Sequence, residues 1–154
     1  MSSYPRTVLC PVAETAAPGS GLPRVAVSLT LPGAHRSSAI ARGAVTAALR
    51  AHGLTAYLWP AVFVAAELVA VTVSLTPGRD LYLSLRHRDD VLRLLVWDQH
   101  PHHPAPAAEA PCEGRRRRAL WLVAAVVDDW GGEWGTCAAP PPQRGTKSWV
   151  TLPR

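Results

Sequence analysis

Apolar and polar residues alternate along several short segments of the chain, and this period of two is typical of strands with one buried face. In the segment RVAVSLTL the alternate apolar residues are Val25, Val27, Leu29 and Leu31. The segments DLYLSLR and VLRLLVW are joined by a short stretch that contains RDD, which favours a turn, so the two predict a hairpin. The predicted strands cover residues 24–31, 80–86, 91–97, 133–138 and 147–152.

Other segments repeat their apolar residues with the spacing of an amphipathic helix. The first helix is expected to bury one stripe, made of Ile40, Ala44, Ala47 and Ala48. The second has Pro60 in its first turn, where proline is tolerated, and all three helices end close to a glycine. The predicted helices cover residues 35–52, 57–75 and 117–129.

The order of these elements is strand, helix, helix, strand, strand, loop, helix, strand, strand. It predicts an α+β fold, a two-layer sandwich whose mixed, mainly antiparallel sheet carries helices on one face. At 154 residues the chain is long enough for one domain with a real core and too short for two. We expect a mobile tail over residues 1–23, a domain over residues 24–154, and a mobile Pro-rich loop over residues 99–114.

The net charge is +5, but one run, Arg115 to Arg118, supplies four positive charges, so no broad basic face is predicted. Such a run is either a solvated surface or a site for phosphate or an acidic protein. The three cysteines, Cys10, Cys112 and Cys137, have no metal-like spacing, and the N-terminal segment lacks a basic-then-apolar signal pattern. A reduced cytoplasm is the expected location.

Residues 56–73 are almost entirely apolar, and this raises the question of a membrane span. Glu67 and Pro60 interrupt the segment, and Ala and Val supply most of its apolar character, which is weak for a span. We therefore expect a buried core helix and no membrane insertion.

His100, His102 and His103 raise the question of a metal site, because imidazole binds zinc, copper and nickel. Prolines lie between and around them, and no cysteine is at ligand spacing in the sequence, so a solvated loop is favoured. The six tryptophans divide by position. Those on predicted elements are expected in the core and the others could lie at an interface; the two sets are Trp97, Trp121 and Trp130, and Trp59, Trp134 and Trp149.

Four segments in this order resemble the gyrase, histidine-kinase and MutL-type ATPase superfamily, and most closely its small actinobacterial anti-sigma-factor-like serine kinases. AELV is similar to the start of the N-box helix, and VWDQHP to the G1 box, where an Asp ends a strand before the lid loop. RRALWLVAAVVDDWGG is similar to the G2 segment, and GTKSWVTL to the strand behind the adenine. The resemblance covers residues 24–152 and implies the histidine-kinase-like ATPase (Bergerat) fold, with a lid over residues 99–116.

The resemblance gives Glu67 the place of the general base, a carboxylate that takes a proton from water or a serine hydroxyl. One helical turn later, the family's Mg²⁺-binding Asn is replaced by Val71, which offers no oxygen ligand. No metal ligand and no certain cofactor are therefore assigned, and Mg²⁺ binding is not expected. The alternative for Glu67 is an acid at the edge of a core helix, paired with an arginine.

The implied nucleotide pocket is also altered. Asp98 matches the Asp that accepts a hydrogen bond from the adenine amino group, with Thr146 or Ser148 beside it, although an Asp can also simply end a strand. Arg117 and Ala119 stand where glycines would let backbone N–H groups approach phosphate. Arg118 could still meet a phosphate by charge. We predict that ATP binds weakly or no longer binds.

These residues predict an anti-sigma-factor-like regulatory protein that acts by protein–protein binding, with Arg115, Arg116, Arg117 and Arg118 as the partner-binding residues. The partners implied are a sigma factor, its antagonist or a helix-turn-helix regulator, and a homodimer stays open. Two alternatives are an active ATP-dependent serine protein kinase that uses Glu67, and a DNA-associated transcriptional regulator that uses the arginine run.

Overall fold

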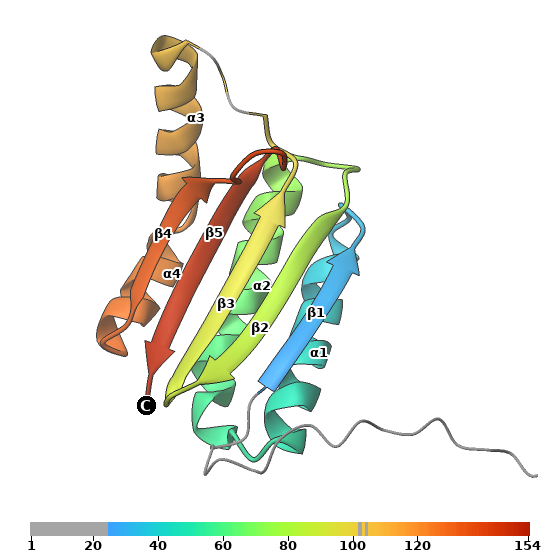
Figure 1. Ribbon diagram of the computed structural model, residues 1–154, viewed down its shortest axis with the longest axis vertical. Helices are drawn as coiled ribbons and strands as arrows, with labels where there is room; N and C mark the ends of the chain where they lie inside the picture. Colours follow the sequence, from blue (N-terminus) through green and yellow to red (C-terminus); the bar gives the residue numbers. More distant parts are fainter. Residues whose placement is uncertain (1–24, 102, 104) are drawn as a thin grey trace, which may run out of the picture.

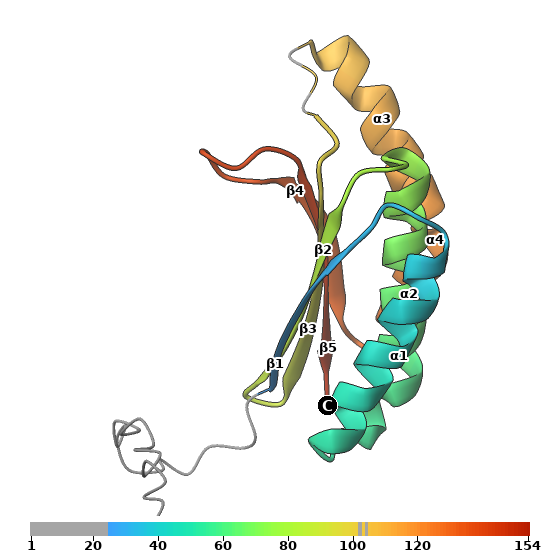
Figure 2. The same cartoon turned by 90° about the vertical axis from the view of Figure 1, so that its right-hand side faces the viewer.

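A computed structural model describes residues 25–101, 103 and 105–154. The described chain forms two layers, a five-stranded sheet and a layer of helices that covers one of its faces (Figures 1 and 2). This arrangement confirms the predicted α+β class. The sheet is antiparallel throughout, with no parallel pair among the described strands, so the expected mixed sheet is wrong in this detail. The predicted tail over residues 1–23 lies outside the described residues.

The strands lie in the order β1-β2-β3-β5-β4, so β3 is at the centre and β1 and β4 form the edges. In chain order the elements are β1 (Val25–Leu31), α1 (Arg36–Ala51), the 3-10 helix η1 (Thr55–Tyr57), α2 (Leu58–Leu75), β2 (Leu81–Arg88), β3 (Val91–Asp98), α3 (Pro106–Ala119), α4 (Trp121–Asp129), β4 (Glu133–Ala138) and β5 (Thr146–Pro153).

Strands β2 and β3 form the hairpin that the two alternating segments predict. Leu83 and Leu85 of β2 are buried, and each faces a buried residue of β3 in the paired register. Asp89 and Asp90 both have positive φ, 53° and 60°, the conformation of a tight two-residue hairpin turn that Asp tolerates. The predicted turn is therefore formed by these two acids.

The face that the first helix was predicted to bury is wrong. Ile40, placed in the buried stripe, is 47% exposed. The helix instead buries residues spaced four apart, Ser37, Ala41, Val45 and Leu49. Burial of the polar Ser37 is possible because its hydroxyl donates a hydrogen bond to the Pro32 carbonyl at 2.6 Å.

Helix α2 lies across the centre of the sheet and contributes much of the core (Figure 1). With η1 it is long and apolar enough to span a membrane by length and composition, with a mean hydropathy of 1.9. However, 56% of this apolar window is buried inside the protein. Core helices pass the same test of length and composition, so this burial is compatible with a soluble protein.

The loop predicted over residues 99–114 is mostly helical. Helix α3 begins at Pro106, where proline costs no hydrogen bond, and continues through Pro111 to Ala119. The chain leaves the α conformation at Leu120, and α4 follows directly, so the single helix predicted over residues 117–129 is two helices. The expected lid is thus a short connection followed by a helix, which extends past the end of the sheet (Figure 1).

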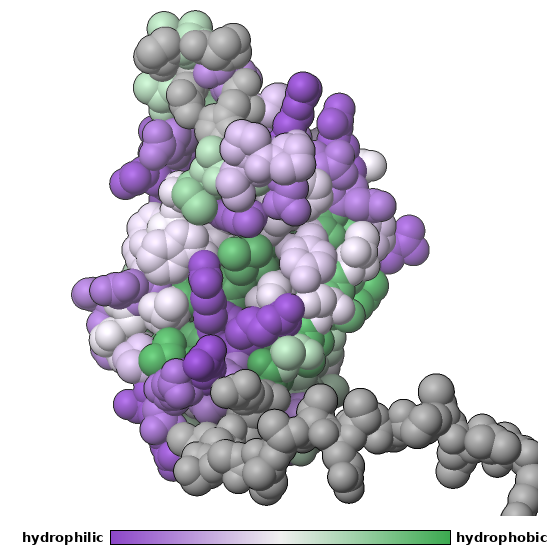
Figure 3. Space-filling model, in the orientation of Figure 1, coloured by the Kyte–Doolittle hydropathy of each residue, from purple (hydrophilic) through white to green (hydrophobic). Residues whose placement is uncertain are grey.

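The other face of the sheet carries no helix among the described residues (Figure 2). Arg86 and Arg93 are exposed cross-strand partners on this face. Trp97 and Trp149 lie on the same face and are half-buried. The space-filling view shows hydrophilic and apolar side chains mixed over it, with no single large apolar area (Figure 3).

Candidate functional site

A cavity of about 300 Å³ lies where β3 ends, between the connection to α3, helix α3 itself and the β4–β5 edge. This volume is at the lower limit of ordinary small-molecule pockets, about 300–1,000 Å³. Its wall includes two histidines, two cysteines and Thr146. Asp98, the residue expected to accept a hydrogen bond from adenine, is fully buried and does not contribute to this wall.

The carboxylate of Asp98 is held by an internal ion pair. Its Oδ2 accepts a hydrogen bond from Arg116 Nη1 at 2.6 Å, and its Oδ1 accepts one from the backbone N–H of His100 at 2.9 Å. The side chains of Asp98 and Arg116 are 0% and 5% exposed. Arg116 Nη1 also lies 3.4 Å from Ser148 Oγ. Both oxygens of Asp98 therefore already have partners from this chain.

The other predicted nucleotide contacts are only partly assembled. Thr146 pairs with Asp98 across the β3–β5 ladder and reaches the cavity wall, and Ser148 is buried beside Arg116. Arg118 is exposed and is not part of the wall. The structure thus brings together three of the four predicted residues and leaves the phosphate contact outside.

Glu67 lies away from this cavity. It is half-buried on α2, with Val71 buried one turn later, and α2 reaches the cavity wall only at Leu75, about 12 Å along the helix axis from Glu67. Glu67 has no ion-pair partner among the described residues. The pair with an arginine that was the alternative prediction for this residue is therefore not seen there.

The arginine run is divided by the fold. Arg116 is buried in the ion pair, so the structure does not present its side chain to a partner, as the predicted partner-binding role would require. Arg115, Arg117 and Arg118 are exposed, and Arg117 makes an exposed pair with Glu113 at 3.2 Å. A helical period predicts this division, because neighbouring residues of a helix point in different directions.

Trp121 follows this run and is 64% exposed, so its expected place in the core is wrong. Leu122 beside it is 40% exposed. Trp130 does pack against the core, although it is only half-buried, and its Nε1 donates to the Pro153 carbonyl at 2.8 Å. We call the exposed set Arg115, Arg117, Arg118, Trp121 and Leu122 the α3–α4 surface.

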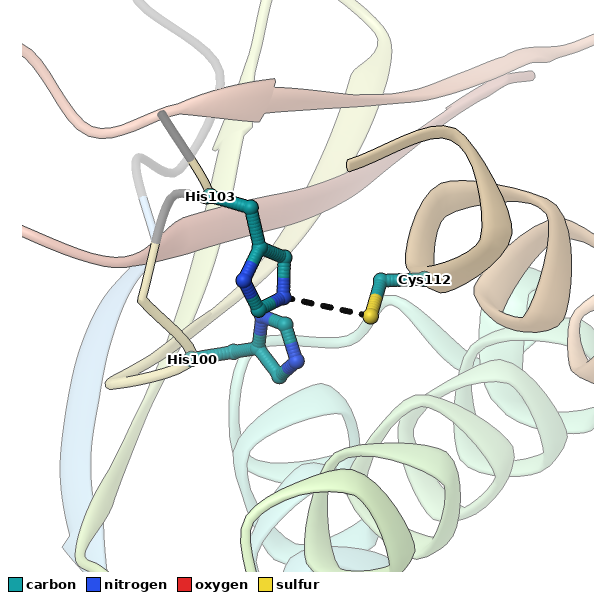
Figure 4. Close-up of side chains that lie close together, drawn as sticks. All are labelled: His100, His103 and Cys112. Atoms are coloured by element: carbon teal, nitrogen blue, oxygen red, sulfur yellow. Dashed lines mark hydrogen bonds between the residues drawn. The ribbon is translucent and has the colours of Figure 1, made fainter. Parts of the chain in front are cut away.

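His100 and His103, for which the sequence favoured a solvated loop, lie on the cavity wall with Cys112, which the sequence did not associate with them (Figure 4). Cys112 follows His103 by nine residues, a spacing that no common metal motif has, and the turn into α3 brings the two together. Burial lowers the pKa of His100 below its usual value, and the Arg116 charge lowers it further, while the Asp98 charge raises it. His102 lies outside the described residues.

No protein-family model matches the chain, and no curated protein matches it in sequence. The assignment of a function therefore depends on the residues and the geometry of this chain.

Proposed function

We propose that this chain is an anti-sigma-type regulatory protein that acts in the cytoplasm by binding another protein, and that it does so without ATP. The observation that carries the proposal is the buried ion pair between Asp98 and Arg116. Asp98 is fully buried and is not part of the cavity wall, so an adenine amino group could reach it only if Arg116 or the His100 segment moved away. Removing one partner from a buried charge pair costs roughly 3–5 kcal/mol, which would offset much of the free energy of nucleotide binding.

Two further features support the loss of nucleotide chemistry. Arg117 and Ala119 lie in the last turn of α3, where backbone N–H groups bond to carbonyls one turn earlier and are not free for phosphate. The side chain at the position of the Mg²⁺ ligand is Val71, which is buried and apolar. Phosphoryl transfer depends mainly on positioning the reacting groups and on neutralising their charge. Val71 offers no ligand for the Mg²⁺ ion that would do either.

The α3–α4 surface supports the binding role. Arginine and tryptophan are enriched among the residues that dominate protein interfaces, and here both types are exposed at one helix junction. A partner would offer an acidic rim to the arginines and an apolar pocket to Trp121. The resemblance described above implies a sigma factor, its antagonist or a helix-turn-helix regulator as this partner.

The test is a binding titration of the chain with the alternative sigma factors of the source organism, with core RNA polymerase as the competitor and no ATP in the buffer. An anti-sigma protein should bind one of them and keep it from the polymerase in proportion to its own concentration. Trp121→Ala should weaken this binding by about 30-fold, the equivalent of a 2 kcal/mol interface residue. Trp59→Ala is the matched control, because Trp59 is equally exposed, at 64%, but belongs to α2.

Inhibition that depends on ATP and leaves phosphate on the target would instead identify a kinase. Tight binding to duplex DNA with a steep salt dependence would identify a DNA-associated regulator. Equal losses in the two tryptophan variants would show that the α3–α4 surface is not the interface.

A further inference from the structure

We infer that His100, His103 and Cys112 form a zinc-binding site that joins the end of β3 to helix α3. The candidate ligand atoms of the three residues all lie within 4.8 Å of one another. Cys112 Sγ is 3.2 Å from His103 Nε2, and the two imidazole rings are 5.3 Å apart at 78°. Figure 4 shows the rings and the thiol converging between the connecting segment and the helix.

The donor set fits Zn²⁺ in number, type and spacing. Zinc binds cysteine sulfur at about 2.3 Å and histidine nitrogen at about 2.0–2.1 Å, so tetrahedral ligand atoms lie roughly 3.3–3.6 Å apart. The 3.2 Å contact already has nearly this spacing, and the remaining distances, at most 4.8 Å, need a contraction of no more than about 1.5 Å, which side-chain rotation provides. Three protein ligands leave the fourth position open, and here it faces the cavity.

The positions of these ligands are set by the buried ion pair. Asp98 accepts the backbone N–H of His100, and so orients the segment that carries both histidines. Arg116 is one helical turn after Cys112, on the same side of α3. The Asp98–Arg116 contact therefore anchors the helix with Cys112 turned toward the rings. Such outer contacts commonly orient metal ligands and raise metal affinity.

A cysteine–histidine pair at this distance also suits nucleophilic catalysis, in which imidazole activates the thiol. The third donor distinguishes the two interpretations, because a nucleophilic thiol needs one activating imidazole, whereas His100 brings a second imidazole to the same point. Metal binding is therefore the interpretation that uses all three side chains. It is independent of the protein-binding role proposed above.

The experiment uses the reduced, metal-free full chain. Zn²⁺ should bind with a stoichiometry of one per chain, measured by competition with a chromogenic chelator, and Co²⁺ should give a thiolate-to-metal absorption band. Cys112→Ser and His103→Asn should each lower Zn²⁺ affinity by more than the roughly 10–100-fold that is typical of outer-contact changes. Cys137→Ser is the matched control for the thiol, since Cys137 lines the same cavity on β4, and it should stay within a few-fold of the natural protein.

A measurement on the natural protein needs no variant to fold. Zn²⁺ should protect Cys112, and not Cys137, from alkylation by iodoacetamide, read by mass spectrometry of peptides. Equal loss of Zn²⁺ affinity in Cys112→Ser and Cys137→Ser would overturn the three-residue site. Fast alkylation of Cys112 that Zn²⁺ does not slow would also overturn it and would favour the nucleophile.

Discussion

Replacing Arg116 by Met is expected to be among the most damaging single changes at this end of the molecule. Methionine matches only the unbranched aliphatic part of arginine and carries no charge, so the fully buried Asp98 carboxylate retains only the His100 N–H as a partner. Breaking a buried pair in this way costs about 3–5 kcal/mol. For a chain of this size each kcal/mol lowers the melting temperature by about 2–4 °C, so a decrease of roughly 6–20 °C is expected.

The assay is thermal and urea unfolding followed by circular dichroism, with Arg117→Met as the control. Arg117 pairs with Glu113 at the surface, where the two side chains are 63% and 49% exposed, so its loss should cost under about 1 kcal/mol. Adding Asp98→Asn to Arg116→Met should recover stability, because no buried charge remains. Equal costs for the two arginine variants would refute the burial argument.

Three other predictions concern nucleotide binding, the role of Glu67 as a base, and the glycine that precedes β5. Millimolar Mg-ATP should hardly shift the melting temperature, whereas a ligand at roughly 100 times its Kd would add about 2.7 kcal/mol; a shift of several degrees that EDTA abolishes would contradict this. The Glu67→Gln variant should bind the partner protein as tightly as the natural protein does, and the natural protein should not transfer phosphate to the partner. Phosphate transfer that the variant loses would disprove both statements. Gly145→Ala should cost about 1–3 kcal/mol in urea unfolding, because φ is 109° and a Cβ would collide with the Asp98 carbonyl oxygen, whereas Gly43→Ala in an open helical position should not destabilise.

The strands were predictable because burial follows the period-two pattern directly. The β2–β3 hairpin shows this best, since buried residues alternate along both strands. The bounds of β4 (Glu133–Ala138) are as expected although its burial does not alternate, and β5 differs from its prediction by one residue at each end. The phase of α1 was not predictable, because this helix is rich in alanine and presents nearly equal apolar stripes in two directions. A hydrogen bond to Pro32 decides between them by allowing Ser37 to be buried.

Helix α3 was missed because its own sequence opposes it. It contains an internal proline, Pro111, and a glycine, Gly114, and these two residues disfavour a helix. What favours the helix is tertiary, since Arg116 can reach Asp98 only when the chain is coiled at this point. The same contact explains why the candidate metal cluster could not be predicted, because Cys112 meets the histidines only through this helix.

The position of β3 at the centre of the sheet has a consequence for how the chain folds. Its pairing with β2 needs only the Asp89–Asp90 turn, whereas its pairing with β5 must first close the long chain segment that contains α3 and α4. Loop closure costs entropy before contacts are gained, so the β2–β3 hairpin should form before the β3–β5 ladder. We therefore expect Arg116→Met to accelerate unfolding and to leave the refolding rate almost unchanged in stopped-flow measurements.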